Sequence, residues 1–352
     1  MTRAKNPPPV SFDVGLTVNR HGKPALDCQF SVPRILGTVA SMRADLSVSS
    51  FIAHSFNLGY VLPFASCWRF SADVVRQVND FHSSSSFSES VQGLGFGWSC
   101  GSHRFGLDAH LRDIHPLVTL VGAKTVASEQ LRRVPLRTIK TGFSYDYNLD
   151  RALTEACRAV GGYKVGLRGE ICGLFGDVNF AKCEASYSLY RRVWRGLVYH
   201  GSVGGGAIGQ LGKSVTPIQD RFFIGGTSEQ KYALRGFASR SVGPSGKRIL
   251  AAPAMPGDKL VDHLGGEAFV SMDNVISFPV AGVYAMAFLQ AGSLLPSLHS
   301  SVSKNTRVCA GVGVMVPVGN MGTAEITLGR PIFGRQTTDT VQSLQIGLRI
   351  SM

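Results

Sequence analysis

Short stretches in which apolar and polar residues alternate recur along most of the chain. Val10 to Asn19, Ala25 to Val32, Ser41 to Ser49 and Ile52 to Leu62 each alternate in part, and turn residues follow them. A period of two places successive side chains on opposite faces of a β-strand. Strands of about 9–11 residues with this pattern are typical of membrane barrels. With about 20 residues for a strand and its turn, the chain would hold about 16 strands.

A transmembrane helix is not expected, because no stretch approaches the roughly 18 apolar residues that one needs. The most apolar run, Val280 to Leu289, is followed by Gln290 and Gly292. Only helices and closed barrels satisfy the backbone inside lipid. We therefore predict an all-β fold, an antiparallel transmembrane barrel of about 16 strands. Residues 10–352 would form the barrel after a short leader, residues 1–9, with no soluble N-terminal domain.

Signals for other structure are few. Ser128 to Arg133 and Asp150 to Val160 could each form a turn or two of helix, and the serine-rich stretch Asn79 to Gly93 is expected to be a mobile loop. The longest irregular region, about Gly225 to His263, is rich in glycine and proline. Loops of this length tend to be functional. We expect this one to fold into the barrel lumen.

Composition narrows the functional classes. Charged residues make up 17% and hydrophobic residues 44%, with a mean hydropathy of +0.10. A soluble domain usually carries about 25% charged residues. The net charge is +13, but the basic residues are scattered and no RNA-binding motif is present, so nucleic acid is not an expected partner. The N-terminal sequence has no apolar signal segment, which argues against export to a bacterial outer membrane.

No group of residues predicts catalysis, a metal or a cofactor. The seven cysteines have no CxxC spacing, and the nine histidines have no HExxH spacing. Reduced thiols are expected. Glu170 and Asp177 are interpreted as lumen charges or loop bonds rather than acid–base groups. We therefore expect a protein that is not an enzyme.

A series of short motifs, in a fixed order, resembles the BamA-type barrel-assembly (bacterial surface antigen) superfamily. The motifs are Lys140–Gly142, Gly176–Lys182, Arg221–Gly226, Leu234–Phe237, Leu264–Ala268, Ala287–Gly292, Arg307–Gly313 and Gly329–Pro331. Gly176–Lys182 and Leu264–Ala268 are similar to the barrel subunit of the mitochondrial sorting and assembly machinery. The resemblance covers residues 137–352, and residues 1–136 fit by strand pattern alone.

The resemblance implies a loop lock inside the barrel. Its residues would be Arg235, Gly236, Phe237, Gly265, Gly266 and Gln290. The guanidinium of arginine binds carboxylates or carbonyls through a fork of donors, so Arg235 should point at the inner wall near Gly266 or Gln290. Superfamily members often carry an acid where this chain has Gln290, so that contact is expected to be neutral.

The C-terminal residues resemble the signal by which mitochondrial barrels are recognised for insertion, with Gln345, Gly347, Ile350 and Met352 at the matching positions. Ile346, Leu348, Ile350 and Met352 should share a lipid-facing side of the last strand, and the alternate residues should face the lumen. This strand should meet the first strand in a short seam that serves as a lateral gate.

The resemblance implies an insertase for precursor β-barrels in the mitochondrial outer membrane. Its expected partners are precursor barrels, accessory subunits of the assembly complex and outer-membrane lipid. Three alternatives stay open: a passive pore, a protein-import channel of the same superfamily, and a truncated barrel without insertase activity. The long loop with its Leu234–Phe237 motif argues against a simple pore.

Overall fold

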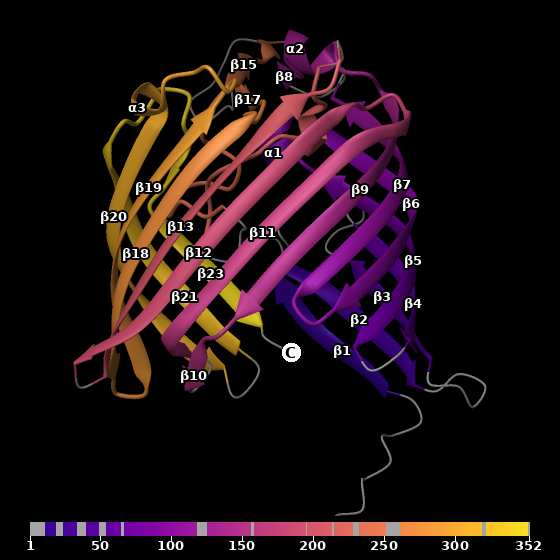
Figure 1. The fold of residues 1–352 in the computed structure, drawn as a ribbon. Helices are drawn as coiled ribbons and strands as arrows, with labels where there is room; N and C mark the ends of the chain where they lie inside the picture. The colour runs from indigo at the N-terminus through magenta and orange to yellow at the C-terminus, as the bar shows by residue number, and fades with distance from the viewer. Residues whose placement is uncertain are drawn as a thin grey trace, which may run out of the picture.

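A single antiparallel sheet forms most of the molecule (Figure 1). The computed structural model describes residues 11–18, 24–33, 40–48, 54–64, 67–117, 125–155, 158–194, 196–212, 215–227, 232–250, 261–318 and 322–350. Each wall strand pairs with the next one along the chain. The expected all-β antiparallel class is confirmed.

The sheet contains 17 strands. They are β1 (Ser11–Val18), β2 (Pro24–Pro33), β3 (Ser41–Val48), β4 (His54–Phe64), β5 (Trp68–Asp80), β6 (Phe87–Cys100), β7 (His103–Pro116), β9 (Arg137–Asp150), β10 (Leu153–Glu155), β11 (Arg158–Gly176), β12 (Phe180–Trp194), β13 (Leu197–Gln210), β18 (Ala268–Val280), β19 (Val283–Leu295), β20 (Thr306–Val318), β21 (Gly322–Phe333) and β23 (Leu344–Ile350). The short β10 extends β9 along the same edge of β11.

Smaller elements lie mainly toward one end of the sheet and in its interior (Figure 1). They are α1 (His82–Ser85), α2 (Glu129–Arg132), α3 (Val302–Asn305), the 3-10 turn η2 (Ile218–Asp220), β8 (Thr125–Val126), β14 (Gly236–Phe237), β15 (Ser245–Lys247), β16 (Ile249–Leu250), β17 (Val261–His263) and β22 (Val341–Gln342). Among the described residues, no helix is long and apolar enough to cross a membrane.

Two local expectations are wrong. The serine-rich stretch Asn79 to Gly93 is not a loop, because β5, α1 and β6 account for most of it. Ser84, Ser85 and Ser86 are buried rather than solvated, and the Ser85 hydroxyl donates to the His263 carbonyl at 2.7 Å. The described residues 153–155 and 158–160 of the predicted helical segment Asp150 to Val160 are extended rather than helical, because β10 and the start of β11 pair there. The expected helical turn at Ser128 to Arg133 is confirmed by α2.

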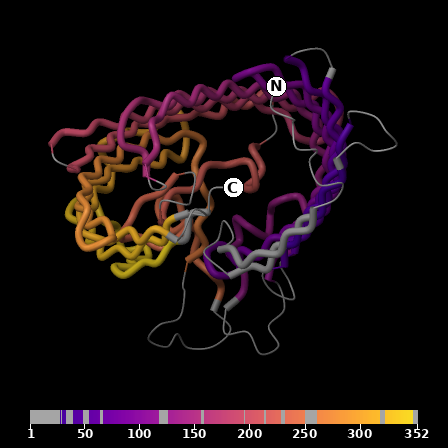
Figure 2. Tube along the Cα trace, turned by 90° about the horizontal axis from the view of Figure 1, so that it is seen from below, coloured from indigo at the N-terminus to yellow at the C-terminus, as the bar shows by residue number. Residues whose placement is uncertain are grey.

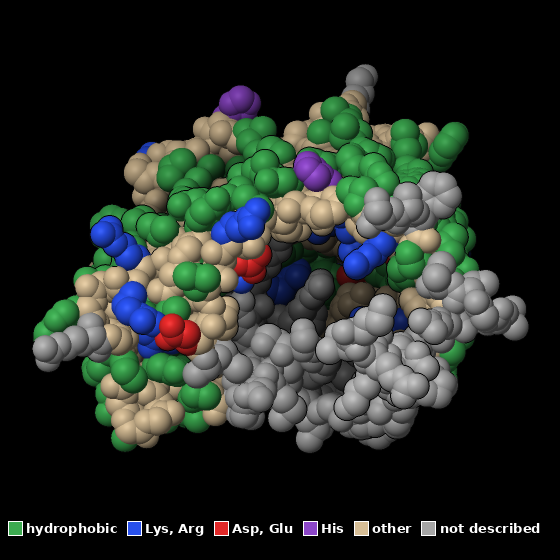
Figure 3. Space-filling view, turned by 60° about the horizontal axis from the view of Figure 1, so that its bottom comes forward, with side chains coloured by type: hydrophobic (Ala, Val, Ile, Leu, Met, Phe, Trp, Pro, Cys, Tyr) green, Lys and Arg blue, Asp and Glu red, His purple; other side chains and the backbone are tan. Residues whose placement is uncertain are grey.

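Alternation gives the wall two chemically different faces. On β18, Val270, Met272 and Ile276 are exposed, whereas Phe269 and Val275 are buried. Figure 3 shows hydrophobic side chains over the outer side of the wall and charged side chains around the hollow. Such a surface suits a strand wall with an apolar outside and a polar inside.

The wall curves around an interior that other segments of the chain occupy (Figure 2). One buried cluster joins Phe222, Leu234 and Phe237 from the long loop to Phe269 and Phe288 from the wall. A second joins Phe81, Phe87, Ile114, Leu131 and Ile218. The interior therefore contains two packed hydrophobic clusters.

No ladder between β1 and β23 closes the sheet among the described residues, although Cα atoms of the two strands come within 8 Å. Closure by the last strand was expected and is not seen here. Both strands are short, so their facing edges can form few hydrogen bonds.

Candidate functional site

The site is centred on residues 215–250, which we call the interior loop. The chain leaves the wall when β13 ends at Gln210 and rejoins it at Ala268, so the excursion begins before the predicted Gly225. Within the loop, Ile224 bridges to Val242 and Gly226 bridges to Leu234. These bridges fold the loop back on itself and bring Arg235 to its tip. Residues 228–231 and 251–260, parts of the predicted loop, lie outside the described residues.

Arg235 is held by two carboxylates of the inner wall. Its Nε donates to Glu325 Oε1 at 2.6 Å, and its Nη1 donates to Asp273 Oδ2 at 3.2 Å. The guanidinium also lies over the Phe288 ring, 5.1 Å from the centroid. Burial alone would lower the pKa of Arg235, but Glu325 and Asp273 raise it, so the side chain stays charged. Arg235 is 3% exposed, and a buried charge needs such partners.

Gln290 binds the backbone of the loop at Arg235. Its side-chain oxygen accepts a hydrogen bond from the backbone N–H of Arg235 at 2.6 Å, and that contact is neutral. The contact at Gln290 is therefore neutral, as expected, and the guanidinium pairs separately with acids on β18 and β21. Asp273 is the register partner of Gln290 in the β18–β19 ladder. One of the two acids that bind Arg235 therefore lies on the strand next to Gln290.

Gly236 and Phe237 join the loop tip to the last strand. They form β14, which pairs with β22 immediately before β23. Gln345 on β23 accepts a hydrogen bond from the Gly236 N–H at 3.1 Å and donates one to the Phe237 carbonyl at 2.7 Å. Gly236 has a φ of +84°, and a Cβ there would lie 2.5 Å from the sulfur of Cys309. Only glycine allows this close approach.

Gly265 and Gly266 serve a different contact from Arg235. Gly266 exchanges two backbone hydrogen bonds with Phe222, each 2.9 Å long. Gly265 has a φ of +70°, and a Cβ there would meet the Phe222 carbonyl at 2.9 Å. The two glycines hold the end of the loop, where the chain returns to β18, against Phe222. Of the six predicted lock residues, the structure places Arg235, Gly236, Phe237 and Gln290 in one contact region.

The predicted residues of the last strand occupy its two faces. Gln345 is 3% exposed and faces the interior, whereas its neighbour Ile346 is 70% exposed on the outer face. Gly347 lies opposite Glu325 in the β21–β23 ladder, and Ile350 ends the strand. Met352 lies outside the described residues.

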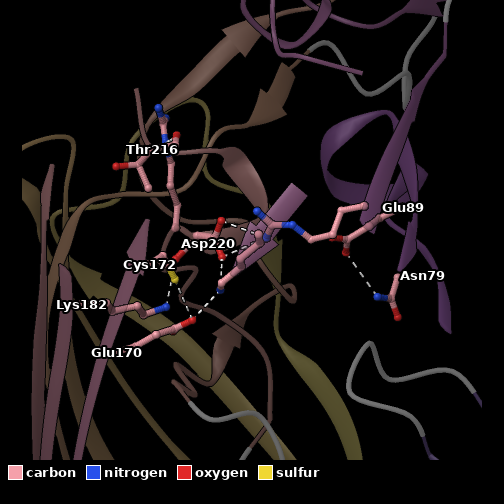
Figure 4. Close-up of polar contacts among 10 residues, drawn as sticks. Asn79, Glu89, Glu170, Cys172, Lys182, Thr216 and Asp220 are labelled. Atoms are coloured by element: carbon pink, nitrogen blue, oxygen red, sulfur yellow. Dashed lines mark hydrogen bonds and ion pairs between the residues drawn. The ribbon is translucent and has the colours of Figure 1, made fainter. Parts of the chain in front are cut away.

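A second anchor, not predicted from the sequence, holds the other end of the interior loop (Figure 4). Asp220 of η2 accepts from Arg112 on β7 at 3.0 Å and from Lys140 on β9 at 2.7 Å. Lys182 on β12 donates to the Asp220 carbonyl at 2.9 Å. Lys140 also pairs with Glu170 at 2.5 Å, which agrees with the interpretation of Glu170 as an interior charge. Asp177 accepts from the Ile139 N–H at 3.2 Å, a loop bond.

The charge state of Asp220 follows from these neighbours. Burial alone would raise its pKa, but Lys140 and Arg112 hold the pKa below the ordinary value. Asp220 therefore stays ionised and ties three strands to the loop. Farther along the loop, Arg240 stacks on Phe223 and Phe81, with the guanidinium carbon 3.5 and 4.1 Å from the ring centroids. Burial lowers the pKa of Arg240 to about 9.

The wall has a fold similar to those of BamA and CdiB. The crystal structure of BamA from Haemophilus ducreyi lacking POTRA domains 1–3 is similar, with a TM-score of 0.79 and 15% identity over 97% of this chain and 70% of that chain. CdiB from Escherichia coli gives a TM-score of 0.56 at 16% identity, over 99% of this chain and 63% of the other. At these identities the likeness concerns the fold.

The sequence match is to the Omp85 superfamily domain, over residues 34–352, and the chain belongs to that superfamily. It is 26% identical over 245 residues to the sorting and assembly machinery component 50 homolog of Bos taurus, covering 64% of this chain and 48% of the relative. Outer membrane protein assembly factor BamA of Nitratidesulfovibrio vulgaris is 30% identical over 122 residues, 33% of this chain and 13% of the relative. The chain thus spans about half the length of the component 50 relative of Bos taurus.

Proposed function

We propose that this chain forms a transmembrane barrel of about 16 strands that inserts precursor β-barrels into the mitochondrial outer membrane. The observation that carries this proposal is the way in which the last strand, β23, is paired. β23 pairs with β21 on one edge and is bound to the interior loop on its inner face. Among the described residues, its other edge has no ladder with β1.

Such an edge suits strand exchange. Unpaired N–H and C=O groups on a sheet edge template the pairing of another strand. A precursor strand could therefore pair there by β-augmentation, and the precursor could then grow by hairpins and leave laterally. Burial of apolar strand faces in lipid would drive the process, so the proposed activity needs neither a nucleotide nor a cofactor.

The interior loop favours this function over a passive pore. It is anchored to β7, β9 and β12 through Asp220 and to β18 and β21 through Arg235. A strap with two ionic anchors would obstruct free passage through the lumen. Nor is a hydrolase favoured: the Gly-x-Ser-x-Gly string at Gly97–Gly101 leads from β6 into a hairpin, whereas a nucleophile elbow leads into a helix.

The similarity to component 50 homologs supports a mitochondrial location, with precursor barrels, accessory subunits and lipid as partners.

The direct test is depletion of the protein in cells, followed by native-gel analysis of newly made outer-membrane barrels. We expect precursors to accumulate unassembled. Normal barrel assembly after depletion would reject the proposal.

The gate itself is tested by cysteine pairs that join β1 to β23. Because β1 and β23 share no ladder among the described residues, positions in β1 are scanned against Arg349→Cys. Oxidation of a productive pair should stop precursor insertion, and reduction should restore it. The matched control joins Thr323→Cys to Arg349→Cys, which are register partners across the paired β21–β23 edge. Unchanged insertion by a chain locked at β1–β23 would show that the seam is not the gate.

A further inference from the structure

Two cysteines lie together at one rim of the sheet. Cys67 precedes β5, and Cys100 is the last residue of β6. β5 runs from Trp68 to Asp80 and α1 follows it, so this rim is at the opposite end of β5 from α1. Both cysteines are free; Cys67 is exposed and Cys100 is half-buried.

The ladder brings the two thiols within reach of each other. Trp68 is the register partner of Cys100, so Cys67 is one residue from the paired position. The Cys67 and Cys100 side chains lie within hydrogen-bonding reach. Partners in an antiparallel ladder have Cα atoms about 4.5–5.5 Å apart. Cys67 and Cys100 are one step off such a pair, so their Cα atoms are somewhat farther apart, and a disulfide accommodates Cα separations up to about 6.8 Å.

We propose that Cys67 and Cys100 are a redox-active pair whose disulfide staples the turn before β5 to the end of β6. Among the described residues, the other cysteines lack this arrangement. Cys172 and Cys309 are buried in the interior. Cys183 is exposed, but its register partners are Gly169 in the β11–β12 ladder and Ala207 in the β12–β13 ladder.

The chemistry is thiol–disulfide exchange with a small-molecule disulfide such as oxidised glutathione. One protein thiolate attacks a sulfur of that disulfide, and the first small thiolate leaves and takes up the proton that the attacking thiol released. The second protein thiolate then attacks the mixed disulfide and releases the second small thiol. Two protein thiols are oxidised to one disulfide, and the small disulfide is reduced to two thiols.

The test uses the purified full chain in detergent micelles, incubated with mixtures of reduced and oxidised glutathione. Free thiols are then alkylated and the peptides are analysed by mass spectrometry. We expect a peptide pair joined through Cys67 and Cys100 that disappears on reduction. Cys67→Ser should abolish this pair and leave Cys100 free or glutathionylated, whereas the matched control Cys183→Ser should leave it unchanged.

Separate glutathione adducts on Cys67 and Cys100, with no joined peptide in the wild-type chain, would overturn the proposal. So would a joined peptide that forms no more readily than one containing Cys183. The wild-type chain carries the readout itself, so a variant that folds poorly does not affect the decision.

Discussion

Replacing Glu325 with glutamine removes one charge from the ion pair that holds the interior loop. Arg235 is 3% exposed, and Glu325 accepts from its Nε at 2.6 Å and from its Nη2 at 3.3 Å. Removing one partner of a buried ion pair costs about 3–5 kcal/mol, because the other charge is left unpaired. Asp273 and the Phe288 ring still face the guanidinium, so we expect the lower end, about 3 kcal/mol.

The assay is urea unfolding of the chain in lipid vesicles, followed by tryptophan fluorescence. Adding Arg235→Met to Glu325→Gln should recover part of the lost stability, since the buried guanidinium is then gone and only Asp273, whose side chain is 20% exposed, loses its ion-pair partner. The matched control is Glu129→Gln on α2, which removes an exposed pair with Arg133 and should change little. If Glu325→Gln and Glu129→Gln have equal effects, the ion pair does not stabilise the fold. A double variant as unstable as the single one would rule out the unpaired charge as the cause.

Three further predictions concern other parts of the site. Asp220→Asn should destabilise the chain at neutral pH. The folded pKa of Asp220 is below 3.8, so its contribution to the free energy of unfolding is complete above pH 3.8 and is lost as the pH falls through the folded pKa. A difference between the variant and wild type in urea unfolding that persists below that pKa would contradict this. Gly236→Ala should cost about 1–3 kcal/mol in the same assay, since φ is +84° there, and a neutral effect would show that the loop tip can relax. Ile350→Asp should prevent carbonate-resistant membrane integration, whereas Gly347→Val should alter native-gel assembly more than integration; wild-type behaviour of both would reject the role given to the last strand.

The sequence predicts the class of fold because alternation is a local property. Each strand carries its own pattern, so β18 and β19 can be recognised without knowing their neighbours. The pattern fails where packing is non-local. The serines of α1 look like a solvated loop, yet Ser85 is buried because β17, far along the chain, supplies the His263 carbonyl as its acceptor.

The residues of the loop lock could likewise be predicted only in part. Arg235, Gly236 and Phe237 are adjacent in the sequence, and their motif could be recognised through its resemblance to a family. The acids that hold Arg235 could not, because Asp273 and Glu325 lie on β18 and β21, and their convergence depends on the register of every ladder between them. Asp220 was missed for the same reason, since its partners come from strands earlier in the chain.

The positions of the anchors also predict which side of the seam moves. β23 is bound on its inner face by Gln345, which contacts the same loop tip that Arg235 ties to β18 and β21. The far end of the loop is tied to β7, β9 and β12 through Asp220. Separating β23 from this frame would break several buried polar contacts, whereas parting β1 from β23 breaks none of them.

We therefore expect β1 to move away while β23 stays fixed. Spin labels placed on β12 and β23 should keep one distance distribution when a precursor strand peptide is added, and labels on β12 and β1 should broaden or shift. Asp220→Asn, which loosens the frame at its far end, should let the β12–β23 distance vary as well. A β12–β23 distance that shifts in the wild-type chain while β12–β1 stays constant would show that the interior loop does not hold the last strand in place.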